Sequence, residues 1–186
     1  MISIWKDLQG TYIFQNGFKV VKDVKNNKSI YYDIYSEFYN VNKFRELKSI
    51  MHHGDNRLNH INRVAKLSFL MSKKLGYDYI SCTRGAMMHD FFTKSDIKKG
   101  DTKYSNFLKT HPNIALNNAN NYFDINEIES DIITTHMYPI TKEKPKYKES
   151  KLVCICDKLV SMYEFFRFEL GITYVFAYIF CVRTLL

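Results

Sequence analysis

The sequence predicts an all-α protein with its main body between residues 41 and 168. From residue 41 onward, apolar residues recur at the three- and four-residue spacing of a helix face, and Asn, Asp, Gly and Pro stand where such helices begin and end. At 186 residues, 46% of them apolar, the chain is long enough to bury one core. We therefore expect one helical domain over 41–168, an N-terminal arm over 1–40 and an apolar tail over 169–186.

Residues 1–40 carry one clear structural signal, the dipeptide Asn16-Gly17. Both positions of a two-residue hairpin turn need positive φ, which Asn and Gly adopt readily. Apolar and aromatic runs flank the dipeptide at residues 11–14 and 18–21, as in two short strands. We predict a small hairpin or an irregular arm in this part, without functional residues.

Two helices are predicted next. The first runs from residue 41 to about 51 on the basis of its apolar spacing. The second can be capped by Asp55 or Asn56, whose side chains accept hydrogen bonds from the first free backbone N–H groups. It should end at Leu75, because the following Gly76 suits the left-handed conformation that closes many helices.

The third predicted helix contains the adjacent pair His89 and Asp90. Asp78 can cap this helix, which should run from Tyr79 to about Phe92. The pair lies in an apolar stretch, where a buried charge is costly unless it is paired or binds a metal. The pair therefore predicts a site, for which other segments must supply the partners.

Two helices should follow. Proline is tolerated in a first helical turn, where its missing N–H is not needed. We therefore expect His111 and Pro112 to open a helix after a connection over residues 103–110. Asn126 and Glu129 have the spacing of a reciprocal cap pair, which marks the start of the next helix.

The chain closes with one more amphipathic helix and an apolar tail. His136 ends the preceding helix before Pro139, and Ser150 can cap the last helix, in which Asp157 is an isolated acid. Residues 170–182 carry no charge, but this stretch is shorter than the ~20 residues that a membrane-spanning helix needs. The tail is therefore interpreted as a core helix, with membrane contact left open.

The charge and the cysteine content bear on the binding partners and the cellular compartment of the protein. A formal charge of +8 and a pI near 9.2 predict attraction to phosphate, nucleic acid or acidic membrane surfaces. The lysines cluster with acidic residues in two predicted loops, 94–103 and 142–151, which does not make a dedicated nucleic-acid-binding tract. Four cysteines in apolar surroundings and no cleavable signal segment favour a reducing cytoplasm. Cys154 and Cys156 are interpreted as core residues rather than a metal pair.

Four of the six histidines and two aspartates form an ordered set. Apart from the adjacent pair His89-Asp90, successive members are separated by about one helix and its connection. Imidazole nitrogens and carboxylate oxygens together suit iron, manganese, zinc or similar divalent ions. The set consists of His60, His89, Asp90, His111, His136 and Asp157.

This set resembles the metal-binding pattern of the HD-domain metal-dependent phosphohydrolase superfamily. The resemblance spans roughly residues 44–165 and includes local context, such as Arg57 three residues before His60 and Pro112 directly after His111. Histidines at both 111 and 136 are similar to the binuclear branch, which includes diadenosine tetraphosphate hydrolases, cyclic dinucleotide phosphodiesterases and a few di-iron oxygenases. The resemblance implies an HD-domain helical bundle.

The resemblance also implies a metal centre with two divalent ions, iron, manganese or similar. Asp90 would bridge the ions, and a metal-bound hydroxide would cleave a phosphate ester or anhydride of a nucleotide-like molecule. One ion would be held by His60, His89, Asp90 and Asp157, and the other by Asp90, His111 and His136.

Three further residues are candidates for contact with the phosphorylated substrate. Arg57 and Lys94 are the candidate catalytic and substrate-binding cations, although Lys94 follows Asp90 by four residues where the family commonly has three. His53 is a candidate to bind the substrate, to donate a hydrogen bond to a metal ligand, to protonate the leaving group or to serve as an additional ligand, or else it is a surface histidine. The lysine-rich connection between Lys94 and Lys109, which carries Lys98, Lys99 and Lys103, is predicted to form a lid over the phosphate.

Two other functions fit the same residues. A di-iron oxygenase can share the ligand set and would consume oxygen. A non-catalytic regulatory module could bind a nucleotide, although a pure binder has no need of every metal ligand. No oligomeric state is predicted.

Overall fold

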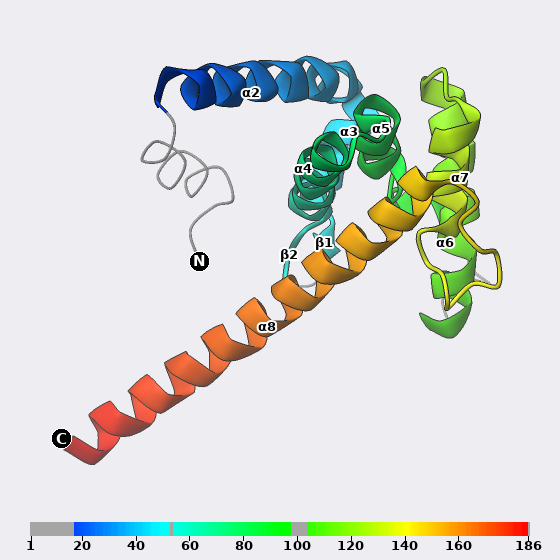
Figure 1. Ribbon diagram of the computed structural model, residues 1–186. Helices are drawn as coiled ribbons and strands as arrows, with labels where there is room; N and C mark the ends of the chain where they lie inside the picture. The colour runs from blue at the N-terminus through cyan, green and yellow to red at the C-terminus, as the bar shows by residue number, and fades with distance from the viewer. Residues whose placement is uncertain (1–16, 53, 98–103, 186) are drawn as a thin grey trace.

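The computed structural model describes residues 17–52, 54–97 and 104–185, with the backbone alone at 17–25, 52, 104–106 and 168–185. It shows a bundle of helices, which confirms the all-α class (Figure 1). In chain order the elements are α2 (Gly17–Tyr39), α3 (Asn42–Glu46), the 3-10 helix η1 (Leu47–Ser49), β1 (Met51–His52), β2 (Asp55–Asn56), α4 (Arg57–Leu75), α5 (Tyr79–Met88), the 3-10 helix η2 (Lys94–Asp96), α6 (Tyr104–Tyr122), α7 (Glu127–Thr135) and α8 (Lys148–Leu185).

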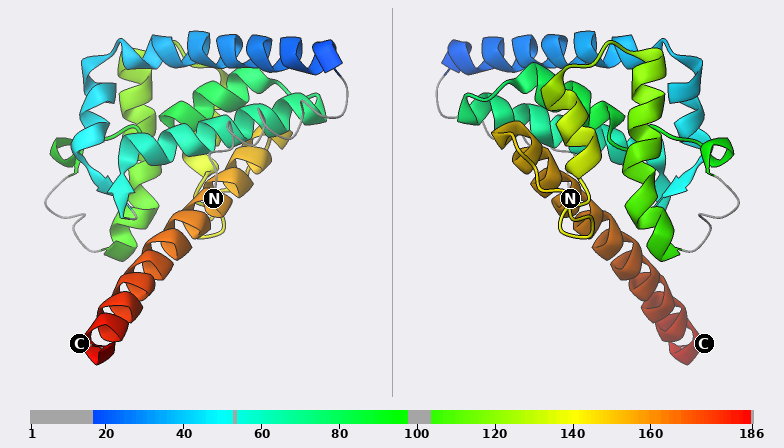
Figure 2. Two further views of the ribbon diagram at one scale, coloured as in Figure 1. Left: turned by 90° about the vertical axis from the view of Figure 1, so that its left-hand side faces the viewer. Right: turned by 90° about the vertical axis from the view of Figure 1, so that its right-hand side faces the viewer.

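The helices α4, α5, α7 and α8 form the centre of the bundle. Helix α4 packs against α5 and α8, and α7 packs against the same two helices (Figure 2). Their apolar faces meet in one core, which includes the fully buried residues Ile61, Phe69, Met87, Ile132 and Val153. This packing places the residue after α5 beside the first turn of α4 and the third turn of α8.

The starts of α4, α5 and α7 follow the predicted capping signals, whereas Ser150, the predicted cap of the last helix, lies inside α8, which begins at Lys148. The Asn56 side chain accepts from the backbone N–H of residue 59 and caps α4, which ends at Gly76 with φ +67°. Asp78 caps α5. Asn126 and Glu129 form the predicted reciprocal pair at the start of α7. These local hydrogen bonds satisfy backbone groups that the helix itself leaves unpaired.

The N-terminal prediction is wrong for the residues that can be compared. Asn16 lies outside the described residues, but residues 18–21, the second strand of the expected hairpin, belong to helix α2. Further along α2, Tyr31 and Phe38 are buried in the core, so residues 17–39 are neither a hairpin nor an irregular arm. Packing of these aromatic side chains accounts for the helix, since tertiary contacts commonly override a local turn preference.

A pair of short strands lies at residues 51–56, after the segment in which the hairpin was predicted. Strands β1 and β2 are antiparallel, with residue 51 opposite residue 56 and residue 52 opposite residue 55. Gly54 has φ +78° in the turn between them, a conformation that glycine adopts without steric cost. This small hairpin leads directly into α4.

Two boundaries near the site differ from the predicted ones. His89 is the C-terminal cap of α5, so the His89-Asp90 pair lies just beyond that helix instead of inside it. His111 and Pro112 lie inside α6, which already begins at residue 104. The Phe107 ring, one turn earlier, packs on Phe92 and on His111. These contacts favour helix before the proline, where the sequence suggested a connection.

The apolar tail is the end of α8. Both views in Figure 2 show α8 extending beyond the other helices, so the tail does not return as a separate core helix. Within the described parts of the chain, no helix combines the length and the apolar character needed to cross a membrane.

Candidate metal centre

The bundle brings all six predicted ligands to one place. They come from the first turn of α4, the residues after α5, the middle of α6, the residue after α7 and the third turn of α8. Every one of them is buried. The six are His60, His89, Asp90, His111, His136 and Asp157.

The ligands form two groups of three, each with its ligand atoms within 4.8 Å of one another. In the first group, Asp157 Oδ1 lies 3.1 Å from His60 Nε2 and 3.7 Å from His89 Nε2. This group joins α4, the end of α5 and α8. Its two nitrogens and one carboxylate are sufficient donors for a divalent ion that keeps other positions for water or substrate.

The second group contains Asp90, His111 and His136. Asp90 Oδ1 lies 3.4 Å from His111 Nε2 and 3.8 Å from His136 Nε2. The two groups adjoin, since the rings of His89 and His136 have centroids 5.0 Å apart. Asp90 belongs to the second group. That its carboxylate bridges both ions stays a prediction.

Backbone carbonyls set the tautomers of three of these histidines. The Nδ1 atoms of His89, His136 and His111 lie 2.8 Å from Ala86 O, 2.8 Å from Ile133 O and 3.0 Å from Phe107 O. A carbonyl oxygen only accepts, so each Nδ1 carries the hydrogen. In a neutral ring this leaves the Nε2 lone pair free, and all three Nε2 atoms point into the cluster.

The free lone pairs fit a metal ion. His111 Nε2 and His136 Nε2 are 3.0 Å apart, yet neither atom has a hydrogen to donate in that tautomer. His89 Nε2 is buried and has no hydrogen-bond partner among the described residues. Nitrogens bound at about 2.0–2.1 Å to one ion are separated by about 3 Å at right angles. A cation would therefore turn a repulsive arrangement into a favourable one.

The pKa values support neutral rings in the second group. Burial, reinforced by the neighbouring His89 and His111, holds the pKa of His136 at about 3. Burial likewise lowers the pKa of His111, against the opposing effect of Asp90. Neutral imidazole is the form that binds metals.

The first group has a different electrostatic character. Burial lowers the pKa of His60, but hydrogen bonds to Asp157 and Glu164 outweigh it and raise the pKa to about 10. Burial raises the pKa of Asp157, but the His60 hydrogen bond and the charge of the nearby histidines lower it well below its usual range. Asp157 is therefore an ionised carboxylate, a strong ligand for a divalent ion.

Arg57 is a buried cation beside the second group. Its Nη1 donates to Phe92 O at 2.7 Å, and its guanidinium lies 3.8 Å from the Phe92 ring centroid. Burial lowers its pKa and the charge of Asp90 raises it. Nε is buried without a hydrogen-bond partner among the described residues. The fold thus places the predicted cation Arg57 close to the ligand Asp90.

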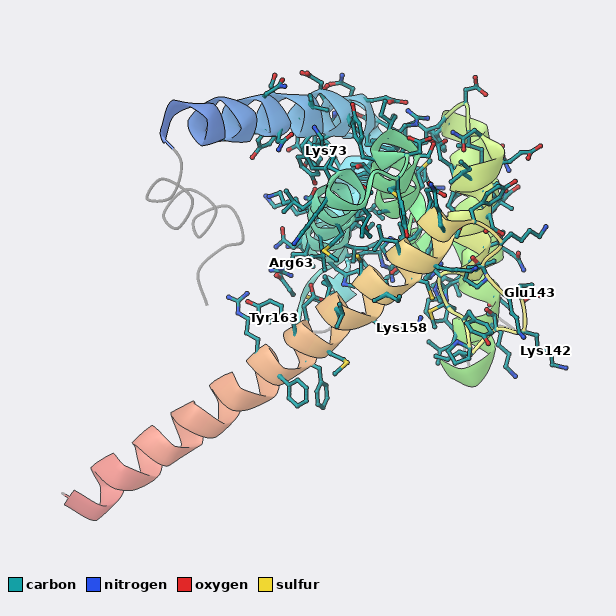
Figure 3. The ribbon with its side chains drawn as sticks, viewed as in Figure 1. Arg63, Lys73, Lys142, Glu143, Lys158 and Tyr163 are labelled. Carbon is teal, nitrogen blue, oxygen red and sulfur yellow. The ribbon has the colours of Figure 1, made fainter. Side chains whose placement is uncertain are left out.

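Among the described residues, no contact joins the other predicted substrate-binding residues to the six ligands. Lys94 is exposed at the start of η2. His53 and residues 98–103 of the predicted lid lie outside the described residues. On either side of 98–103, residues 94–96 form η2 and residues 104–109 belong to helix α6 instead of a loop. In the second lysine-rich loop, Lys142 and Glu143 lie at the outer side of the α7–α8 connection (Figure 3).

Two charged residues of the site were not predicted from the sequence. Glu164 is buried and contacts His60 Nδ1 at 2.8 Å. Arg63 donates to Glu164 at 2.7 Å. A signal was available, because Glu164 lies seven residues after Asp157 and Arg63 three residues after His60, both spacings that keep side chains on one helix face.

Each of the two adjoining groups could hold a metal ion. Comparison with protein-family models, with curated proteins and with solved structures found no match. The function assigned to the chain therefore rests on its own residues.

Proposed function

We propose that this protein is a metal-dependent phosphohydrolase of the HD-domain superfamily, acting on a phosphate ester or anhydride of a nucleotide-like molecule. The observation that carries the proposal is the pair of adjoining ligand groups, each with three buried ligands. The six residues of the resemblance would have no reason to meet if they were unrelated core histidines and acids.

In this proposal His60, His89 and Asp157 hold one ion, and Asp90, His111 and His136 hold the other. Two adjacent divalent ions, such as iron or manganese, lower the pKa of water and supply positive charge to phosphoryl oxygens when they are bound. The protein's part is to keep the imidazoles neutral and oriented. It does so through the backbone carbonyls that hold each Nδ1–H and through burial.

The buried guanidinium supports a phosphorylated substrate. Arg57 is held by Phe92, and its Nε is left as a donor beside the second group. A planar guanidinium matches the oxygens of a phosphate and neutralises charge that develops on them. The formal charge of +8 also favours the approach of an anion.

The same ligands would serve a di-iron oxygenase, which is the second candidate from the sequence. A buried cation beside the metal groups favours the hydrolase, because phosphate needs charge neutralisation and a non-phosphate substrate of an oxygenase does not.

The experiment is metal analysis of protein purified without chelator, followed by a phosphate-release screen over nucleotides and simple phosphate esters. We expect close to two ions per chain and turnover of at least one phosphorylated compound. His136→Ala should remove the ion of the second group and abolish turnover. Two ions with oxygen consumption and no phosphate release would instead identify an oxygenase, and binding of nucleotides without turnover would identify a regulatory module.

A further inference from the structure

Glu164 is an acid buried on the face of α8 that also carries Asp157. It is 4% exposed, whereas Phe165 and Phe166 directly after it are 55% and 54% exposed. Seven residues are close to two helical turns, so the two carboxylates lie on the same side of α8. A carboxylate is seldom buried unless it is paired, and the partners of Glu164 are specific.

Both carboxylate oxygens of Glu164 contact α4. Oε2 lies 2.8 Å from His60 Nδ1, and Oε1 accepts from Arg63 Nη1 at 2.7 Å. Arg63 in turn donates to Asp55 of β2 through Nη2. Figure 3 shows Arg63 on the side of α4 that faces α8. The carboxylate is thus fixed from two sides, and Glu164 belongs to neither of the two ligand groups.

The environment of His60 differs from that of the other ligand histidines. Those three donate through Nδ1 to carbonyls in their own segments, so local backbone geometry orients their rings. The Nδ1 of His60 faces the carboxylate of another helix. Glu164 accepts the Nδ1 hydrogen. Nε2 lies 3.1 Å from Asp157 Oδ1, to which it donates in the protonated ring, and Nε2 would become the ligand atom once an ion displaces that proton.

We propose that Glu164 is a positioning residue that fixes the ring orientation and the tautomer of His60 for an ion in the first group, with Arg63 holding Glu164 in place. This inference rests on the metal binding of the proposed function. An ionised carboxylate on Nδ1 increases the basicity of Nε2 and so strengthens the bond that this nitrogen makes to a metal. A purely structural ion pair between α4 and α8 would affect stability but not metal affinity.

The test measures metal affinity in the full chain, by titration of Mn²⁺ and Co²⁺ against a competing chelator. We expect Glu164→Ala to weaken binding of one ion by about 10–100-fold and to leave the other ion unchanged. It should also change the visible absorption of bound Co²⁺, which reports ligand geometry. Glu164→Gln keeps the shape and an oxygen acceptor, so it should fold and show a smaller loss.

Glu149 offers a matched control on the same helix. It is buried and accepts from the backbone N–H of Asp78 at 3.2 Å, away from the ligands. Glu149→Gln should leave both metal affinities and the Co²⁺ spectrum as in the wild type. Because Glu164 acts through His60, the double variant with His60→Ala should bind the first ion no more weakly than His60→Ala alone.

The results separate this inference from the proposed function. If Glu164→Ala binds both ions with wild-type affinity and an unchanged Co²⁺ spectrum, Glu164 is only a structural ion-pair partner and the inference is wrong. A wild-type chain that binds no divalent ion overturns both proposals. A chain that binds two ions and releases no phosphate overturns the assigned reaction alone, and the Glu164 comparison then stands by itself.

Discussion

At the scale of single residues, Arg57 is the clearest test of substrate charge. Arg57→Gln keeps a polar side chain but removes the planar, positively charged guanidinium beside the candidate metal ligands. We expect both ions to remain bound and kcat/KM for phosphorylated substrates to fall by about 10²-fold, because the lost donor acts on charge that develops during the reaction. Steady-state kinetics together with metal analysis would measure this.

Arg45 provides the control for that substitution. It makes the same kinds of contact as Arg57, donating to Tyr39 O at 2.7 Å and lying 5.9 Å from the Tyr39 ring centroid, but it is exposed. Arg45→Gln should behave as wild type in kinetics. Equal kinetics for both variants would place Arg57 outside the reaction.

The buried thiol of Cys82 predicts a pH dependence of stability. Burial, together with the nearby Glu149, raises the pKa of Cys82 from 9.0 to about 12. A raised folded-state pKa gives a stabilising contribution that is complete below pH 9 and is lost as the pH rises toward 12, because the unfolded chain releases the proton first. The free energy of unfolding should therefore fall more between pH 8.5 and 10.5 in the wild type than in Cys82→Ala. Parallel denaturation curves in the two proteins would contradict this.

The six ligands could be predicted because each has a residue type that is costly to bury and an order along the chain that matches helix lengths. Glu164 could not be singled out in the same way. An acid in a helix is solvent-exposed by default, and only the position of α4 against α8 shows that this one is buried. The predicted bridging role of Asp90 likewise depends on distances that no sequence pattern contains.

At the scale of elements, the contact between α5 and α7 decides where the metal groups meet. Gly85 on α5 lies against Ile132 on α7, and a Cβ at position 85 would be 2.6 Å from Ile132 Cδ1. Gly85→Ala should therefore push the helices apart and destabilise the fold by about 1–3 kcal/mol. Because α5 leads into His89 and α7 into His136, metal affinity should fall as well. Chemical denaturation and metal titration would measure the two effects.

Gly76 is a useful comparison because its requirement is different. A Cβ there would meet nothing within 4 Å, but φ is +67°. Gly76→Ala should cost about 1 kcal/mol through backbone strain and leave the metal affinity unchanged, because α4 ends there, far along the chain from His60. Equal metal affinity in the two alanine variants would contradict the role given to the α5–α7 contact.

The errors at this scale have a common physical origin. The turn signal at Asn16-Gly17 and the proline at 112 are local preferences, each worth at most a few kcal/mol. The helices observed there carry aromatic side chains that pack at a distance, Phe38 against Phe123 and Phe107 against Phe92. The cap residues Asn56, Asp78 and Asn126 predicted helix starts correctly because the hydrogen bonds that define them are themselves local.

At the scale of the whole molecule, the ligand groups tie together segments from α4 to α8. A ligand that binds the folded chain and not the unfolded chain stabilises it by mass action, by about 4 kcal/mol at a thousand times its Kd. Removal of metal with a chelator should therefore lower Tm, and added Mn²⁺ should restore it. In Asp157→Asn the shift should shrink. An unchanged Tm in thermal denaturation of the wild type, with and without chelator, would show that metals are not held by the folded chain.

The all-α class was predictable as a whole, because amphipathic spacing over residues 41–168 is repeated in every segment of the body. The path of α8 was not. An apolar stretch can lie in a core or continue a helix outward, and the choice depends on whether the other helices leave a space for it.

His60 has a consequence for α8 that does not depend on any bound ion. Its two ring nitrogens lie on opposite sides of the imidazole, and each faces a carboxylate of α8, from Asp157 and from Glu164. A slip of α8 by one residue would rotate both carboxylates by about 100° about the helix axis. The His60 side chain on α4 thus fixes the rotation of the 38-residue helix α8 about its own axis.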